Sequence, residues 1–223
     1  MARKELQFLI TGCGRSGTSY MAKVLQAYGI GAGNERIGAE GVVGWQFAFD
    51  TSVRYVKGRH VKIWLIRPDQ YSFRRIFHQV REPVKVISSC HTIMAKNWRY
   101  IRRHIPIEPE DSLTMMCMKY WYYWNQAAQQ RAEYTYRIED LDQTLNRLLR
   151  DIGHPELCDR DDVIGAIARN TNTRKDKKSI GGRSYRQLTL ADLQAEDEQL
   201  TAKIIDLAGE YGYDVSQYAV TGS

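Results

Sequence analysis

The stretch from Phe8 to Ser19 constrains the fold of this chain most, because an apolar run passes through three glycines into hydroxyl residues. A segment with an apolar stripe at helical spacing follows it, made up of Met21, Val24, Leu25 and Tyr28. The pattern predicts a strand, a glycine-rich turn and a helix. Such a unit forms an anion site, because the backbone N–H groups of the turn and the positive end of the helix dipole point to one place.

The glycines resemble those of a phosphate-binding P-loop but leave out its lysine. Gly12 and Gly17 have the spacing of G-x-x-x-x-G-K-[ST], whereas Thr18 occupies the lysine position. A cation lies inside the loop instead, at Arg15. Without the lysine, and without an evident Mg²⁺ carboxylate after a strand, the loop argues against ATP hydrolysis and ordinary kinase chemistry.

The composition is that of one globular domain with a full core. The chain has 223 residues, 43% of them hydrophobic, and a formal net charge of +6. We expect a single domain over residues 1–223. The basic balance suits an anionic ligand, although nucleic acid or an acidic glycan would suit it too. No apolar run reaches the length of about 18 residues that a membrane span needs.

The cysteines and the first residues indicate a cytoplasmic protein. The first predicted strand follows the N-terminus too closely for a signal peptide. The four cysteines are scattered, without a C-x-x-C pair or a histidine at metal spacing: Cys13, Cys90, Cys117 and Cys158. We expect reduced thiols and no metal site.

Apolar strands alternate with helical segments along the chain. Strands are predicted at 6–11, 75–80 and 134–138, and helices at 18–28, 83–89, 112–133, 139–152 and 189–207. Residues 42–49 are interpreted as a helix packing over the site, 53–66 are left unassigned, and 169–186 are expected to be a basic loop. This alternation predicts an α/β fold of the P-loop type, in three layers with a central parallel sheet flanked by helices.

Two motifs together resemble those of sulfotransferases. The loop from Gly12 to Ser19 is similar to their 5′-phosphosulfate loop, where a lysine or arginine precedes Ser-Gly-Thr. Arg81-Glu82-Pro83, with Ser89 eight residues after Arg81, is similar to their 3′-phosphate motif. Both motifs follow an apolar strand and open a helix. The chain thus resembles the small bacterial-type sulfotransferases that use 3′-phosphoadenosine 5′-phosphosulfate (PAPS).

The resemblance implies a donor site for PAPS, whose product is adenosine 3′,5′-bisphosphate (PAP), and no metal. Arg15 is then the catalytic cation that meets the charge of the leaving phosphate. The residues that the resemblance assigns to the donor are Gly12, Gly14, Arg15, Ser16, Gly17, Thr18, Ser19, Arg81, Ser89, Lys178 and Arg183.

A hydroxyl acceptor needs a base, which related families take from a loop after the first helix as glutamate or histidine. Glu35 is the first candidate and Glu40 the second. His78 is the third, and a hydrogen-bonded core histidine is the favoured interpretation of that residue. The chain departs from the related pattern at Asn34, where a histidine often precedes the glutamate.

Two other functions remain open. One is a P-loop kinase of a small metabolite, for which Glu139 and Asp140 after a weak strand are the available carboxylates. The other is a non-catalytic nucleotide-binding protein of the same fold. For the sulfotransferase, we expect a small-molecule or carbohydrate acceptor and no nucleic-acid partner.

Overall fold

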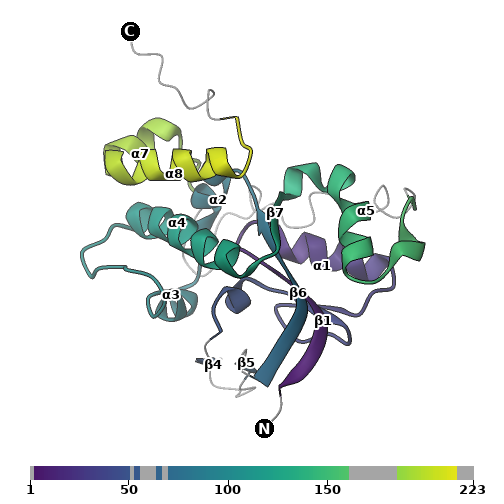
Figure 1. The fold of residues 1–223 in the computed structure, drawn as a ribbon. Helices are drawn as coiled ribbons and strands as arrows, with labels where there is room; N and C mark the ends of the chain where they lie inside the picture. Colours follow the sequence, from purple (N-terminus) through teal and green to yellow (C-terminus); the bar gives the residue numbers. More distant parts are fainter. Residues whose placement is uncertain (1–2, 51–52, 56–63, 67–69, 161–184, 215–223) are drawn as a thin grey trace.

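The computed structural model describes residues 3–50, 53–55, 64–66, 70–160 and 185–214 (Figure 1). The strands are β1 (Lys4–Thr11), β2 (Ala32–Asn34), β3 (Gly41–Val43), β4 (Val53–Tyr55), β5 (Trp64–Ile66), β6 (Tyr71–Val80) and β7 (Tyr134–Arg137). The α-helices are α1 (Thr18–Ala27), α2 (Pro83–Cys90), α3 (Ala95–Ile101), α4 (Leu113–Arg131), α5 (Leu141–Asp151), α7 (Leu190–Glu196) and α8 (Glu198–Glu210). Short 3₁₀ helices are η1 (Trp45–Ala48), η3 (Ile138–Asp140) and η4 (Pro155–Leu157).

Five strands form one sheet in the order β2-β3-β1-β6-β7. Every neighbouring pair is parallel; for example, Ile10 lies opposite Val43 on one side and Phe77 on the other. The chain leaves β1 toward β2 at one edge and returns on the far side of β1 through β6. The crevice at the carboxyl end of β1 is therefore the switch point of the sheet, where α/β proteins bind ligands.

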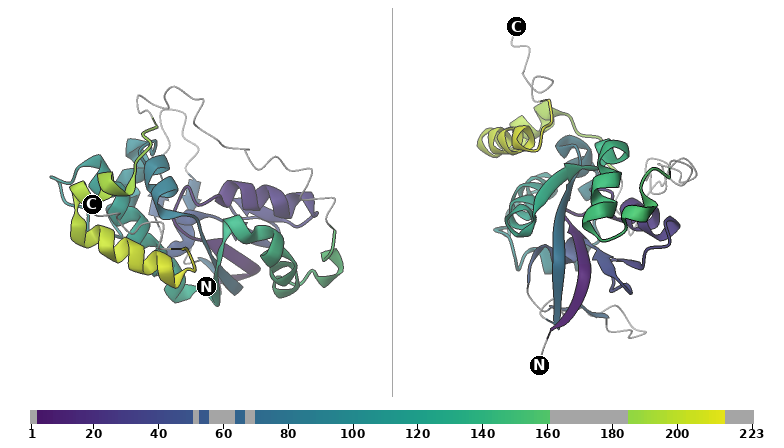
Figure 2. Two further views of the ribbon diagram at one scale, coloured as in Figure 1. Left: turned by 90° about the horizontal axis from the view of Figure 1, so that it is seen from above. Right: turned by 45° about the vertical axis from the view of Figure 1, so that its right-hand side comes forward.

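Helices cover both faces of this sheet, so the predicted three-layer α/β fold is confirmed. Figure 1 shows α1 and α5 on one side and α2, α4, α7 and α8 on the other, and the rotated views in Figure 2 agree. Successive side chains of β1 point to opposite faces of the sheet, which explains the two layers. Phe8 and Ile10 pack with the residues of α1, whereas Leu9 packs against Val42 and Phe47.

Helix α4 supplies the largest buried side chains of its layer. Tyr120, Trp121 and Trp124 are all at most 1% exposed. These three side chains belong to the core, whereas Tyr122 and Tyr123 of the same helix are only partly buried. No helix among the described residues is both long enough and apolar enough to cross a membrane.

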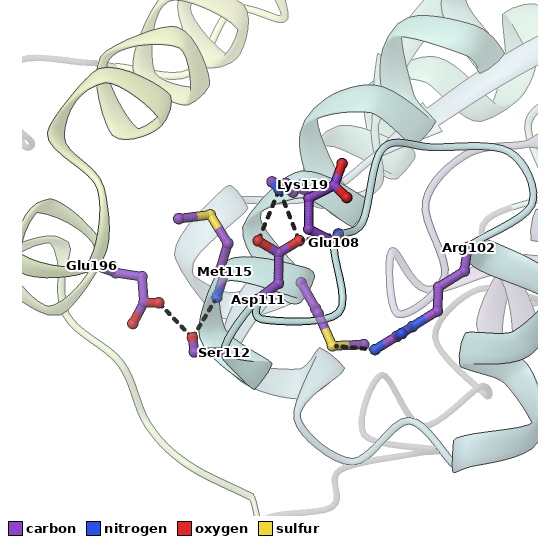
Figure 3. Close-up of polar contacts among 8 residues, drawn as sticks. Arg102, Glu108, Asp111, Ser112, Met115, Lys119 and Glu196 are labelled. Carbon is purple, nitrogen blue, oxygen red and sulfur yellow. Dashed lines mark hydrogen bonds and ion pairs between the residues drawn. The ribbon is translucent and has the colours of Figure 1, made fainter.

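The first turn of α4 is fixed from two directions, as Figure 3 shows. Ser112 caps the helix, since its Oγ accepts the N–H of Met115 at 3.1 Å, and it also donates to the Glu196 carboxylate at the end of α7. One turn further, the Lys119 ammonium contacts both carboxylate oxygens of Asp111 at 2.9 and 2.7 Å. This half-buried ion pair and the cap hold α4 against its neighbours.

Two predicted elements differ in the structure. The helix predicted at 42–49 is wrong: the segment forms the end of β3 and then η1, because a short apolar run fits a buried strand as well as a helix. The helix predicted at 189–207 is two helices. Asp197 takes an extended conformation between them, and its carboxylate accepts the N–H of Leu200 at 2.7 Å to start α8. Within the unassigned segment 53–66, β4 and β5 pair as antiparallel strands.

Candidate functional site

The loop between β1 and α1 approaches β6 so closely that only glycine fits at its start. A Cβ atom on Gly12 would lie 2.1 Å from the carbonyl oxygen of Gln79. Gly17 ends the loop with a φ of 89°, in the left-handed region that glycine adopts without strain. These two positions explain the glycine spacing that stands out in the sequence.

Side chains of α4 hold the first half of the loop. The amide oxygen of Asn125 accepts the backbone N–H of Cys13 at 3.0 Å, and the hydroxyl of Tyr120 accepts that of Gly14 at 3.0 Å. On the other side, the Gln79 amide donates to the Ser16 carbonyl at 2.7 Å. The loop is therefore tied to both α4 and β6.

The second half of the loop keeps its N–H groups available. From Arg15 to Ser19, only the N–H of Ser16 has an acceptor within the described residues, the Cys13 carbonyl at 3.3 Å. Thr18 and Ser19 belong to the first turn of α1, whose N–H groups have no acceptor inside the helix. The buried Ser16 hydroxyl also has no partner among the described residues. This arrangement suits an anion, because it offers several donors and the positive end of a helix.

Arg15 sits in this loop with a φ of 77°, which is unusual for a residue with a side chain. Its guanidinium is half-buried and donates to the Thr92 carbonyl at 3.4 Å. Within the described residues it has no carboxylate partner. Backbone strain and a charge without a carboxylate partner in the described chain are both features that cluster at functional positions.

Arg81 reaches the same loop from the end of β6. Its guanidinium is half-buried and donates to the Arg15 carbonyl at 3.5 Å, and again no carboxylate of the described chain pairs with it. Ser89 lies two turns along α2, partly exposed, and the described residues provide no partner for its hydroxyl. Its neighbour Ser88 is buried and accepts the N–H of Leu188 at 3.0 Å, so Ser88 has a structural task.

Glu35 lies directly after β2, at the same edge of the sheet. Its carboxylate accepts from the Trp45 indole N–H at 3.1 Å and from the Gln46 amide at 3.3 Å. Its backbone is left-handed, with a φ of 53°. The neighbouring Asn34 accepts the Ser19 hydroxyl at 3.4 Å, which connects this segment to the first turn of α1. Trp45 in turn packs edge-on against Tyr120, so Glu35 is linked to the loop through two buried rings.

Glu40 lies before β3, away from the carboxyl edge. Its carboxylate accepts the Gly31 N–H at 2.7 Å and contacts His154 Nε2 at 2.6 Å. Burial acts to raise the pKa of Glu40, but the bonds from Gly31 and His154 outweigh it, and the pKa is lowered overall. This carboxylate therefore holds a turn together, and the structure does not bring it to the loop.

His78 is a core residue, as the favoured interpretation has it. It is fully buried on β6, between the Thr135 hydroxyl at 3.0 Å and the Asn125 amide oxygen at 3.2 Å. The amide oxygen already accepts the N–H of Cys13, so Nε2 of the imidazole carries the proton and Nδ1 accepts from Thr135. Burial lowers the pKa of His78 to about 4, which keeps the ring neutral.

Two predicted donor residues, Lys178 and Arg183, lie outside the described residues. Two residues that contact the loop, Tyr120 and Asn125, were not predicted from the sequence, whereas Trp45 lies in the segment 42–49 that was expected to pack over the site. Apolar and aromatic periodicity assigns them to the interior but does not show which of their polar atoms face the loop. Among the described residues, no group of three or more histidine, cysteine, aspartate or glutamate side chains is arranged to hold a metal ion.

Fold and loop together define an α/β protein of the P-loop type. No protein-family model and no curated protein matches the chain. The chain is similar in structure to a sulfotransferase, the mouse sulfotransferase SULT7A1, whose crystal structure was determined in complex with PAP. The two share 15% sequence identity at a TM-score of 0.48, and the match covers 98% of this chain and 89% of the other.

Proposed function

We propose that this protein is a sulfotransferase that moves a sulfuryl group from PAPS to a hydroxyl or amine of a small-molecule or carbohydrate acceptor. The observation that carries the proposal is the pair of guanidinium groups of Arg15 and Arg81. Both are half-buried at the carboxyl edge of the sheet, and each donates to a backbone carbonyl and to no carboxylate of the described chain. Two such cations beside the free N–H groups of the loop favour a ligand with more than one phosphate group.

The donor would supply the sulfuryl group, and the chain would supply positioning and charge. Glu35 takes the proton of an acceptor hydroxyl, whose oxygen bonds to sulfur as the bond from sulfur to the 5′-phosphate oxygen breaks. The electron pair of that bond stays on the phosphate. Arg15 and the loop N–H groups stabilise the charge that develops there; the guanidinium acts electrostatically, because it does not release a proton at neutral pH.

Arg81 and Ser89 are the proposed partners of the 3′-phosphate. Arg81 directly follows β6 and Ser89 lies on α2, and both have donors without a carboxylate or hydroxyl partner in the described chain. Ser16, whose buried hydroxyl has no partner in the described part of the chain, fits a loop that rearranges around a bound phosphate.

The kinase alternative receives less support. Glu139 accepts the Glu82 N–H at 3.1 Å and the Tyr213 hydroxyl at 3.0 Å, and Asp140 pairs with Arg137. Both carboxylates after β7 are thus engaged with the protein. Because a kinase needs acidic side chains free for Mg²⁺, the geometry favours a metal-independent transfer.

Thermal unfolding with added nucleotides tests the proposal. A ligand that binds only the folded state raises the melting temperature, and at a concentration of about 100 Kd it adds roughly 2.7 kcal/mol of stability. PAP is expected to stabilise the protein more than ATP with Mg²⁺. Stabilisation by ATP with Mg²⁺ and none by PAP would refute the assignment and favour the kinase.

The residue roles are tested by two matched pairs of variants. Arg81→Ala is expected to weaken PAP binding by 10- to 100-fold, as when a charged hydrogen bond of about 1.5–3 kcal/mol is lost. Arg75→Ala, on the exposed part of the preceding strand β6, is the control. Glu35→Gln is expected to abolish transfer from labelled PAPS in an acceptor screen, whereas Glu40→Gln retains it. Equal losses within a pair would contradict the assigned roles.

A further inference from the structure

The polar groups of Tyr120 and Asn125 are buried in the interior yet directed at the backbone of the loop. Tyr120 is 1% exposed and Asn125 is fully buried. Both come from α4, and both accept a backbone N–H at 3.0 Å. We infer that Tyr120 and Asn125 are positioning residues, which orient the 5′-phosphate loop by binding the N–H groups of Gly14 and Cys13. The inference rests on the proposed function.

The two hydrogen bonds decide which donors face a ligand. In a glycine-rich loop, consecutive N–H groups turn toward an anion if nothing else accepts them. Here the N–H groups of Cys13 and Gly14 point to α4, and the chain then turns sharply at Arg15, whose φ is 77°. Of the N–H groups that follow, as far as Ser19, only that of Ser16 has an acceptor in the described part of the chain, so the others are available to a phosphate. Without these two acceptors, the peptide groups that carry the N–H of Cys13 and the N–H of Gly14 would have no fixed direction.

The close packing at Gly14 supports this role. A Cβ atom there would lie 2.7 Å from the Tyr120 hydroxyl, so the residue has room for its hydrogen bond and for nothing more. The Tyr120 ring is wedged against Trp45, Trp98 and Trp124 at centroid distances of 6.2, 5.8 and 4.9 Å. Burial raises the pKa of Tyr120 well above its ordinary value, so its hydroxyl stays neutral.

The orientation of the Asn125 amide is fixed by two donors. Its oxygen accepts the backbone N–H of Cys13 at 3.0 Å and lies 3.2 Å from His78 Nε2. Because both donors meet the same oxygen, the amide keeps that oxygen directed at the loop.

Helix α4 is a suitable base for this task because it is fixed to its surroundings. The capped first turn and the ion pair between Lys119 and Asp111 hold its beginning (Figure 3). In the middle, the Trp124 indole N–H donates to the Trp45 carbonyl at 2.9 Å. The loop therefore takes its orientation from a rigid element.

The test compares Tyr120→Phe with Tyr122→Phe, a matched control whose hydroxyl accepts from Gln126 on the same helix. Isothermal titration measures binding of three probes: adenosine 5′-monophosphate, adenosine 3′-monophosphate and PAP. Tyr120→Phe is expected to weaken the two probes with a 5′-phosphate by about tenfold, as for one buried N–H left without its acceptor. The affinity for the 3′-monophosphate should stay within about twofold. Equal weakening of all three probes, or of none, would overturn the inference.

A second measurement separates this inference from the proposed function. If the unaltered protein binds none of the three probes, the donor assignment fails. Amide hydrogen exchange in the ligand-free protein then still tests whether the Tyr120 hydroxyl holds the loop backbone. The Gly14 amide is expected to exchange at least about tenfold faster in Tyr120→Phe than in Tyr122→Phe. Equal exchange rates would show that the Tyr120 hydroxyl does not hold the loop.

Discussion

The buried imidazole of His78 makes the stability of the fold depend on pH. Its pKa is lowered from an ordinary value of 6.5 to about 4, mainly by burial, which the hydrogen bond that the ring donates to the Asn125 amide oxygen only partly offsets. A folded-state pKa below the unfolded one means that protons bind the unfolded chain more tightly. The stability that the neutral His78 ring contributes is therefore fully present above the unfolded-state pKa. It is lost as the pH falls from about 6.5 toward 4.

The two pKa values set the size of the effect. Their difference corresponds to about 3 kcal/mol once the pH is below both, of which about 2 kcal/mol is lost between pH 7 and pH 5. Urea unfolding at these two pH values measures it. The unaltered protein is expected to lose about 2 kcal/mol more than His78→Gln, whose amide does not titrate. Equal losses in the two proteins would refute the reasoning.

His154 provides a control of opposite sign. Burial acts to lower its pKa, but the hydrogen bonds and charges of Glu40 and Glu156 raise it overall. A raised pKa contributes stability at low pH that is lost as the pH rises through the folded-state value. On acidification, His154→Gln should therefore lose more stability than the unaltered protein, whereas His78→Gln loses less. The same direction of change for both variants would contradict this assignment.

Three further substitutions have consequences for stability that equilibrium unfolding measures. Gly12→Ala places a Cβ atom 2.1 Å from a backbone oxygen of β6 and should cost about 3 kcal/mol or more; a normal stability would disprove the close approach. Ser112→Ala removes the cap of α4 and should cost about 1 kcal/mol, and no loss would show that the cap is not formed. Ser88→Ala leaves the Leu188 N–H without its acceptor and should cost about 1–3 kcal/mol without changing the affinity for PAP. Reduced affinity at unchanged stability would show that Ser88 serves the ligand and not the fold.

The loop and three strands of the sheet, β1, β6 and β7, were predictable because their signals are local, whereas the short strands β2 and β3 were not predicted. A buried parallel strand reads as a short apolar run, and the glycines at 12 and 17 report a close approach and a left-handed turn that no other residue satisfies as well. The same holds for Pro83, which begins α2. Each of these signals lies within a few residues of the structure it specifies.

The two hydrogen bonds that α4 makes to the loop were not predictable, because they join residues far apart in the sequence. Tyr120 and Asn125 meet Gly14 and Cys13 across 106 and 112 positions of sequence. Apolar periodicity indicates that a side chain is buried, but it does not tell which backbone group a buried hydroxyl or amide meets. The error at residues 42–49 has a related cause, since an apolar run carries no signal of how a short strand continues into a 3₁₀ turn.

The left-handed backbone at Arg15 and Glu35 bears on how this protein responds to selection for heat resistance. Both residues have positive φ values, which cost about 1–3 kcal/mol each and which glycine or asparagine accepts with less strain. A library screened for melting temperature alone would favour such replacements at these positions and would enrich variants with an intact fold and no proposed catalytic groups. Screens for a more robust form of this protein should therefore keep residues 15 and 35 fixed and vary the rest.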